Sequence, residues 1–71
     1  MTPPSSLSVR EMKVVMLIAS GLSMKEAARK LGIVFAVTAL HHRNAMRKLR
    51  VTNALGLKRA AIRMGLIVPE R

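Results

Sequence analysis

Residues 23–34 have the sequence SMKEAARKLGIV, and this stretch decides the fold. It opens with a capping box: the Ser23 side chain can accept a hydrogen bond from the Glu26 amide, and the Glu26 side chain can accept one from the Ser23 amide. The apolar residues that follow form a narrow stripe at helical spacing: Ala27, Ala28 and Leu31. Gly32 then supplies the residue type that most often ends a helix. The stretch therefore predicts a helix over residues 24–31 that ends in a glycine turn.

The same arrangement occurs earlier in the chain. Ser8 and Glu11 form a second capping box, and Leu7 stands just before it, where a hydrophobic staple would pack. The apolar residues that follow recur at helical spacing: Val14, Leu17 and Ile18. Gly21 closes the segment. We therefore expect a helix over residues 9–20.

Two further helices are predicted toward the C-terminus. The first spans residues 35–49, but Val34 stands where Ser, Thr, Asp or Asn would be expected, so its first amides have no side-chain cap. Its inward stripe is predicted to hold Thr38, either His41 or His42, Ala45 and Leu49. The second helix spans residues 54–64, and Thr52 and Asn53 can cap it. Its inward residues are predicted to be Leu57, Ala61 and Ile62.

These segments predict an all-α, four-helix domain, and a chain of 71 residues is too short for a second core. Residues 32–34 join a short helix to a longer, basic one through a tight glycine turn, which favours a helix-turn-helix. The same spacing also allows an ordinary helical hairpin. We expect residues 1–6 to be a flexible lead-in, residues 7–67 to form the domain and residues 68–71 to be a tail.

The charge balance indicates the class of partner. Thirteen Lys and Arg against three acidic residues give a formal net charge of +10. The segment between Glu26 and Glu70 contains no acid and these basic residues: Arg29, Lys30, Arg43, Arg47, Lys48, Arg50, Lys58, Arg59 and Arg63. Because self-repulsion of this size destabilises a small domain, a polyanionic partner is the natural explanation. Nucleic acid is favoured over a membrane surface, and a solvated basic surface without a specific partner is the remaining alternative.

Several other classes of function are not expected. The chain has no cysteine, and His41 and His42 are adjacent, so on a helix they point in different directions and share no metal site. Without these groups or paired carboxylates, we expect neither an enzyme nor a bound cofactor, metal or small molecule. The longest apolar run, residues 14–19, is too short to span a bilayer. Residues 1–6 lack the pattern of a signal peptide, so a cytoplasmic protein without membrane contact is expected.

Four segments invite comparison with a known family: residues 7–11 (LSVRE), 18–33 (IASGLSMKEAARKLGI), 47–49 (RKL) and 51–53 (VTN). Together they closely resemble the LuxR/GerE-type DNA-binding domain, in register and without gaps over residues 7–67. The resemblance implies a four-helix module of a transcriptional regulator. It also implies that the module binds double-stranded DNA with its third helix in the major groove, and that two copies pair as a homodimer through the fourth helix.

The resemblance further implies roles for individual residues. The side chains expected at base edges are Ala39, Leu40 and Arg43, with Arg43 as the candidate for guanine. Phosphate contacts are expected from Lys25, Thr38, Arg47 and Lys48. The dimer surface on the fourth helix is expected to include Ala54, Leu55, Lys58 and Ala61.

The third helix departs most from the family pattern. Val34 replaces a typical Ser, and the outward face of the first two turns carries apolar residues in place of polar ones, notably Phe35 and Leu40. Such a face can contact thymine methyl groups but lacks bidentate hydrogen bonds to bases. The alternative function is a protein-interaction module that docks a larger regulator, RNA polymerase or a second copy through this apolar start. A sigma-factor helix-turn-helix has similar geometry but fits the residues less well.

Overall fold

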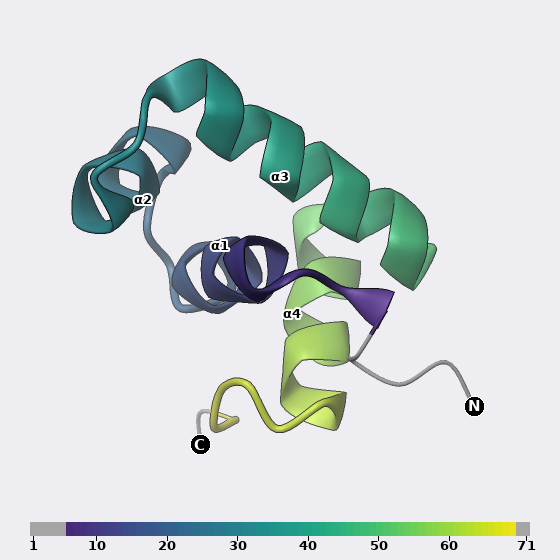
Figure 1. Cartoon of the computed structure of the whole chain (residues 1–71). Helices are drawn as coiled ribbons and strands as arrows, with labels where there is room; N and C mark the ends of the chain where they lie inside the picture. The colour runs from purple at the N-terminus through teal and green to yellow at the C-terminus, as the bar shows by residue number, and fades with distance from the viewer. Residues whose placement is uncertain (1–5, 70–71) are drawn as a thin grey trace.

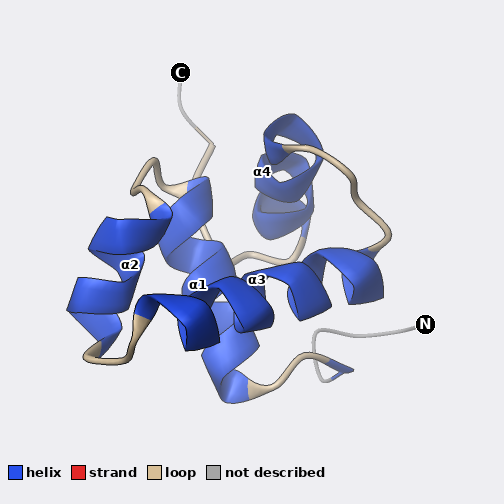
Figure 2. Cartoon of the chain, turned by 90° about the horizontal axis from the view of Figure 1, so that it is seen from above, coloured by secondary structure: helices blue, strands red, loops and turns tan. Residues whose placement is uncertain are grey.

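The computed structural model describes residues 6–69, which form four helices and contain no strand (Figures 1 and 2). The helices are α1 (Val9–Ala19), α2 (Met24–Leu31), α3 (Phe35–Leu49) and α4 (Ala54–Arg63). The predicted all-α class and the bounds of α2 and α3 are confirmed. In contrast, α1 and α4 each end one residue earlier than predicted, at caps formed by Ser20 and Met64. Residues 1–5 of the expected lead-in and residues 70–71 of the expected tail lie outside the described residues.

Both predicted capping boxes are present. Ser8 Oγ accepts from the Glu11 amide at 3.0 Å, and Glu11 Oε1 accepts from the Ser8 amide at 2.9 Å. At the start of α2, Ser23 Oγ accepts from the Glu26 amide at 3.1 Å, and Glu26 Oε1 accepts from the Ser23 amide at 2.7 Å. These bonds satisfy amides that a helix start otherwise leaves unpaired, so the chain itself fixes where α1 and α2 begin.

The other two helices start differently. No side-chain cap is present at Val34, as the sequence predicts, and the bond that opens α3 runs from the Thr38 amide to the Val34 carbonyl at 3.1 Å. At α4, the Asn53 side chain is the cap, because its Oδ1 accepts from the Gly56 amide at 2.8 Å. The start of α3 is thus the one helix start among residues 6–69 without a side-chain acceptor.

The end of α3 contains a backbone conformation that the sequence does not predict. Arg50 has φ 59° and ψ 42°, which is the left-handed region, and it is the only residue other than glycine among residues 6–69 with a positive φ. The corresponding position after α2 is Gly32, with φ 68°. An L side chain in this region is strained, whereas glycine is not. Position 50 therefore carries conformational strain that position 32 avoids.

Replacing Arg50 by glycine is expected to raise the free energy of unfolding by about 0.5–1 kcal/mol, because the strain at the left-handed residue disappears. The measurement is a thermal unfolding curve followed by far-ultraviolet circular dichroism. The matched control is Arg50→Ala, which removes the same charge but keeps a Cβ atom, and we expect no stabilisation from it. Equal midpoints for the two variants would show that charge, rather than backbone conformation, governs this position.

The arrangement of the helices leaves one side of α3 free. Helix α1 packs against the other three helices, and α3 also packs against α2 and α4. Figure 1 shows these three helices on the same side of α3, so that the opposite side of α3 faces outward. The turn between α2 and α3 is short in Figure 2, as the sequence predicts. Helices α2 and α3 therefore form a helix-turn-helix whose second helix is presented at the surface.

The core lies beneath α3, where α1 and α4 meet it. Its central cluster is Leu7, Val15, Ala45, Leu57 and Ala61, all of them buried. Ala61 is 0% exposed, so its assignment to a dimer surface is corrected: the side chain packs inside the domain. On α3, His41 and His42 are both half-buried, and burial lowers the pKa of His42 because its charged form loses hydration.

Candidate nucleic-acid interface

The outward side of α3 gathers the three residues expected at base edges. Ala39, Leu40 and Arg43 lie together in a shallow hollow of about 550 Å³, which Phe35 and Ala36 also line. We call these five residues the apolar hollow. Leu40 is 45% exposed and Phe35 is 56% exposed, so the apolar part of the surface is open to a partner. The sequence predicts Phe35 on this apolar face but assigns neither Phe35 nor Ala36 to base edges, although they lie four residues before Ala39 and Leu40.

Arg43 and Arg47 extend the same side of α3 with positive charge. They are four residues apart and therefore neighbours on one helix face, and both are exposed. The outward side of α3 thus passes from an apolar surface at its first two turns to a cationic surface at the next two. This arrangement presents apolar contacts and donors of hydrogen bonds side by side.

The start of α2 offers a second cationic feature. Lys25 is exposed in the first turn of α2, where the positive end of the helix dipole favours an anion. The nearby Glu26 carboxylate is engaged in the capping box, and the hydrogen bond from the Ser23 amide lowers its pKa. The geometry is compatible with a phosphate contact by Lys25, which remains a prediction.

Thr38 does not belong to the surface. Its side chain is 0% exposed, and its hydroxyl donates to the carbonyl oxygen of Val34 at 3.1 Å. The expected phosphate contact of Thr38 is therefore corrected: the residue packs inward, as its place in the inward stripe of α3 already indicated. Its hydroxyl strengthens the first turn of the helix that lacks a side-chain cap.

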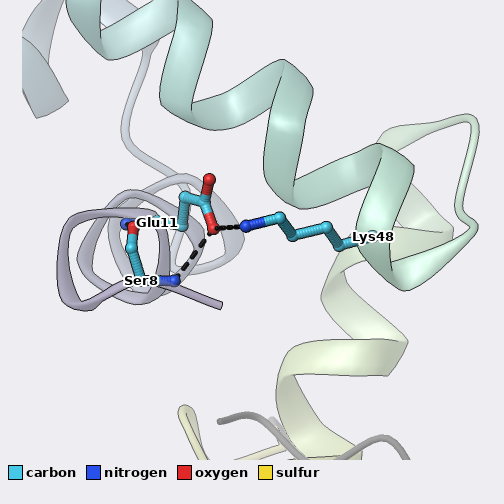
Figure 3. Close-up of polar contacts among 3 residues, drawn as sticks. All are labelled: Ser8, Glu11 and Lys48. Atoms are coloured by element: carbon cyan, nitrogen blue, oxygen red, sulfur yellow. Dashed lines mark hydrogen bonds and ion pairs between the residues drawn. The ribbon is translucent and has the colours of Figure 1, made fainter. Parts of the chain in front are cut away.

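Lys48 differs from Arg47 although the two are adjacent in the sequence. Figure 3 shows the Lys48 side chain reaching from α3 to α1, where its Nζ lies 2.8 Å from Glu11 Oε1. The same carboxylate oxygen accepts from the Ser8 amide, so Glu11 holds the start of α1 and the second half of α3 at once. The side chain of Lys48 is 35% exposed and that of Glu11 only 6%. The ammonium of Lys48 is thus paired with Glu11 within the fold, although about a third of its side chain remains exposed.

The protonation of Glu11 reflects two opposing effects. Burial raises the pKa of Glu11, but the hydrogen bonds from Lys48 and Ser8, together with the positive charge of Lys48, outweigh burial and leave that pKa below its ordinary value of 4.5. Glu11 is therefore ionised at neutral pH. The sequence indicated that Glu11 caps α1, but it gave no sign of a partner in α3.

The surface of α4 contains part of the expected dimer interface. Ala54 and Leu55 are exposed, with Leu55 at 58%, and Lys58 is half-buried. Because Ala61 lies in the core, the predicted dimer surface is reduced to these three residues. Pairing of two copies through α4 stays a prediction.

The described part of the chain was not found to hold a metal cluster or a membrane-spanning helix. Residues 6–69 contain no group of three or more His, Cys, Asp or Glu side chains placed to hold a metal ion. None of the helices described there is long and apolar enough to cross a membrane.

The fold and the exposed, basic third helix define a helix-turn-helix domain of the DNA-binding class. The comparison with protein families agrees: residues 5–61 match the family described as bacterial regulatory proteins, luxR family. The chain is also 39% identical over 61 residues to the transcriptional regulatory protein MctR of Rhizobium johnstonii, an alignment that covers 86% of this chain and 28% of MctR. The chain belongs to the luxR family of bacterial regulatory proteins, and it spans less than a third of the length of this relative.

Proposed function

We propose that the protein is a sequence-specific transcriptional regulator that places α3 in the major groove of double-stranded DNA. The observation that carries the proposal is the outward side of α3, where Arg43 lies in the apolar hollow and the exposed Arg47 adds a second positive charge one turn further along. A helix with its side chains is about 10–12 Å wide and the major groove about 12 Å, so α3 matches the groove. Membership of the luxR family supports the same function.

The charge of the domain supports binding to a polyanion. Within residues 6–69 the carboxylates are Glu11 and Glu26, and each is engaged at a helix start. No acidic side chain of that part of the chain lies on α3. The charged side chains on its outward side are therefore all positive and attract phosphates. Lys25 and Arg47 are the residues that we assign to phosphate contacts. In a bacterium such a regulator acts in the cytoplasm, where the chromosome lies.

The proposal includes pairing of two copies through the surface of α4 that contains Ala54, Leu55 and Lys58. A symmetric pair presents its two α3 helices to successive major grooves, about 34 Å apart, and therefore selects a palindromic site. A contact with RNA polymerase or with a larger regulator would follow DNA binding and would determine how transcription changes.

The test is selection of bound sequences from a random pool of duplex DNA by the full chain. We expect enrichment of a palindromic site, and an affinity for that site that falls steeply as the salt concentration rises. Equal affinity for the selected site and for random duplex would leave a nonspecific DNA-binding protein. No binding to any duplex would reject the proposal and favour the protein-interaction alternative.

Arg43→Ala is expected to relax the preference for guanine at one position of each half-site by about 1–3 kcal/mol, because a bidentate contact to guanine is lost. Lys25→Ala is expected to weaken binding to all duplexes alike and to reduce the salt slope by about 1. The measurement is fluorescence anisotropy of labelled duplexes that differ at single base pairs. Lys13→Ala, which removes an exposed cation from α1, is the control and should change neither the base preference nor the relative order of the duplexes.

A further inference from the structure

The first two turns of α3 present an outward surface without a polar side chain. The apolar residues that line the hollow are Phe35, Ala36, Ala39 and Leu40, and Phe35 is 56% exposed. Thr38 is the one hydroxyl in this segment, and it is fully buried. The first polar group within the hollow is the guanidinium of Arg43. A partner of this surface must therefore offer apolar groups beside an acceptor for Arg43.

The major groove of DNA offers this combination in one arrangement of bases. Thymine is the base that carries an apolar group there, the C5 methyl, whereas guanine presents two acceptors that suit an arginine. A cytosine opposite Leu40 would place its amino group against an apolar surface and lose a hydrogen bond to water. The hollow therefore favours thymine and disfavours cytosine without making a hydrogen bond of its own.

The charges of the domain favour DNA over a second copy as the occupant of the hollow. In a symmetric contact between two copies through this surface, Arg43 of one copy would face the same region of the other. Both copies have a formal net charge of +10, and neither Glu11 nor Glu26 lies on α3 to compensate. A DNA strand instead brings phosphates together with methyl groups.

We propose that Ala36, Ala39 and Leu40 select thymine through its C5 methyl group, next to a guanine bound by Arg43. This inference rests on the proposed function and names the bases that it requires. Leu40 and Arg43 are three residues apart, which is about 4.5 Å along a helix, and base pairs are stacked about 3.4 Å apart. The selected thymine therefore lies within one or two base pairs of the guanine.

The test replaces single thymines of the selected site by deoxyuridine, which lacks only the methyl group and keeps every hydrogen-bonding group. Each methyl group that the hollow contacts is expected to contribute about fourfold in affinity, corresponding to about 0.8 kcal/mol. Putting 5-methylcytosine in place of cytosine at the same position is expected to recover part of the binding lost in a thymine-to-cytosine change. Affinities are measured by fluorescence anisotropy with the full chain.

One variant tests whether the preference for thymine over deoxyuridine comes from the hollow, and a second variant is its control. Leu40→Ala is expected to bind the thymine and deoxyuridine duplexes with nearly equal affinity at the position that Leu40 contacts, and because Leu40 is exposed the fold should be retained. Val9→Ala, which trims an apolar side chain of α1 that is 64% exposed, is the control and should keep the fourfold difference. Circular dichroism checks that both variants are folded.

The outcomes separate this inference from the function on which it rests. If the wild-type protein selects a site but binds its thymine and deoxyuridine forms equally, DNA recognition stands and the role of the methyl groups is overturned. The same conclusion follows if Leu40→Ala keeps the full preference for thymine. If no site is selected at all, the proposed function itself fails.

Discussion

Replacement of Lys48 by methionine is expected to lower the free energy of unfolding by about 2 kcal/mol, because it leaves the buried Glu11 carboxylate without its ion-pair partner. The side chain of Glu11 is only 6% exposed, and once Lys48 is replaced the Ser8 amide is the hydrogen-bond donor that remains to its carboxylate. Breaking a fully buried pair typically costs about 3–5 kcal/mol. We expect less here because the Lys48 side chain is 35% exposed.

The adjacent residue provides the control for this prediction. Arg47→Met removes the same charge from an exposed position, so we expect its unfolding free energy to change by less than about 0.5 kcal/mol. The chain has no Trp or Tyr, so unfolding is best followed by far-ultraviolet circular dichroism. A loss of 2 kcal/mol should lower the midpoint by roughly 8–16 °C in a domain of this size.

For DNA affinity, we expect Arg47→Met to have a larger effect than Lys48→Met, the reverse of their order for stability. Arg47→Met is expected to weaken binding to all duplexes, whereas Lys48→Met should act mainly on stability. A double variant, Glu11→Gln with Lys48→Met, should regain part of the stability because the stranded charge is gone while the side-chain acceptor for the Ser8 amide remains. If Lys48→Met and Arg47→Met unfold at the same temperature, the ion pair does not support the fold and Lys48 is better regarded as a phosphate contact.

The pH dependence of the Lys48→Met effect provides a further check. The pKa of Glu11 is lowered in the folded protein, so the stability that its charged form supplies is present above about pH 4.5 and is lost as the pH falls through the folded pKa. In the variant, burial disfavours the charged form of Glu11 and Lys48 no longer opposes this effect. Protonation of Glu11 therefore removes the cost of a buried, unpaired carboxylate. The difference between the two proteins should therefore shrink below pH 4.5. Burial lowers the pKa of His42, which destabilises both proteins below about pH 6.5 and so cancels in the comparison.

Leu57→Ala is expected to have the largest effect on the fold, lowering the free energy of unfolding by about 3–5 kcal/mol. Leu57 is 0% exposed and belongs to the core cluster, so its truncation leaves a cavity between α1, α3 and α4. A domain of this length has a total stability of only about 4–10 kcal/mol. The variant should therefore lose a large share of its total stability, and urea titration should show a much lower midpoint.

Leu55→Ala is the matched control for Leu57→Ala. Leu55 lies on the same helix and is 58% exposed, so the same chemical change there should alter stability by less than about 0.5 kcal/mol. Similar urea midpoints for the two variants would contradict the packing of α4 described above. A lower degree of self-association in Leu55→Ala would, in addition, support the proposed dimer surface.

The sequence predicted the helix starts well because the hydrogen bonds that define them are local. Ser8 with Glu11, and Ser23 with Glu26, meet across three residues, so the pattern of letters contains the whole interaction. The apolar hollow could also be anticipated, because residues four apart on one helix are neighbours. These features need no knowledge of how the helices pack.

The errors arise where tertiary packing decides. Lys48 and Arg47 look alike as basic residues near the end of α3, but the crossing of α3 over α1 brings only Lys48 to Glu11, 37 residues away. Thr38 and Ala61 were assigned to surfaces through the resemblance, whereas the core covers both of them. The left-handed conformation of Arg50 was not anticipated because the residue there is not glycine.

The ion pair between Lys48 and Glu11 has a consequence for how such domains change over evolution. A substitution at either position alone leaves an unmatched charge in or near the interior, so the two positions are free to change only together. Related sequences that lack an acid at the position of Glu11 should also lack a cation at the position of Lys48, or carry a second acid near it. Arg47 has no such constraint within the fold, and its substitution is limited by what the protein must bind.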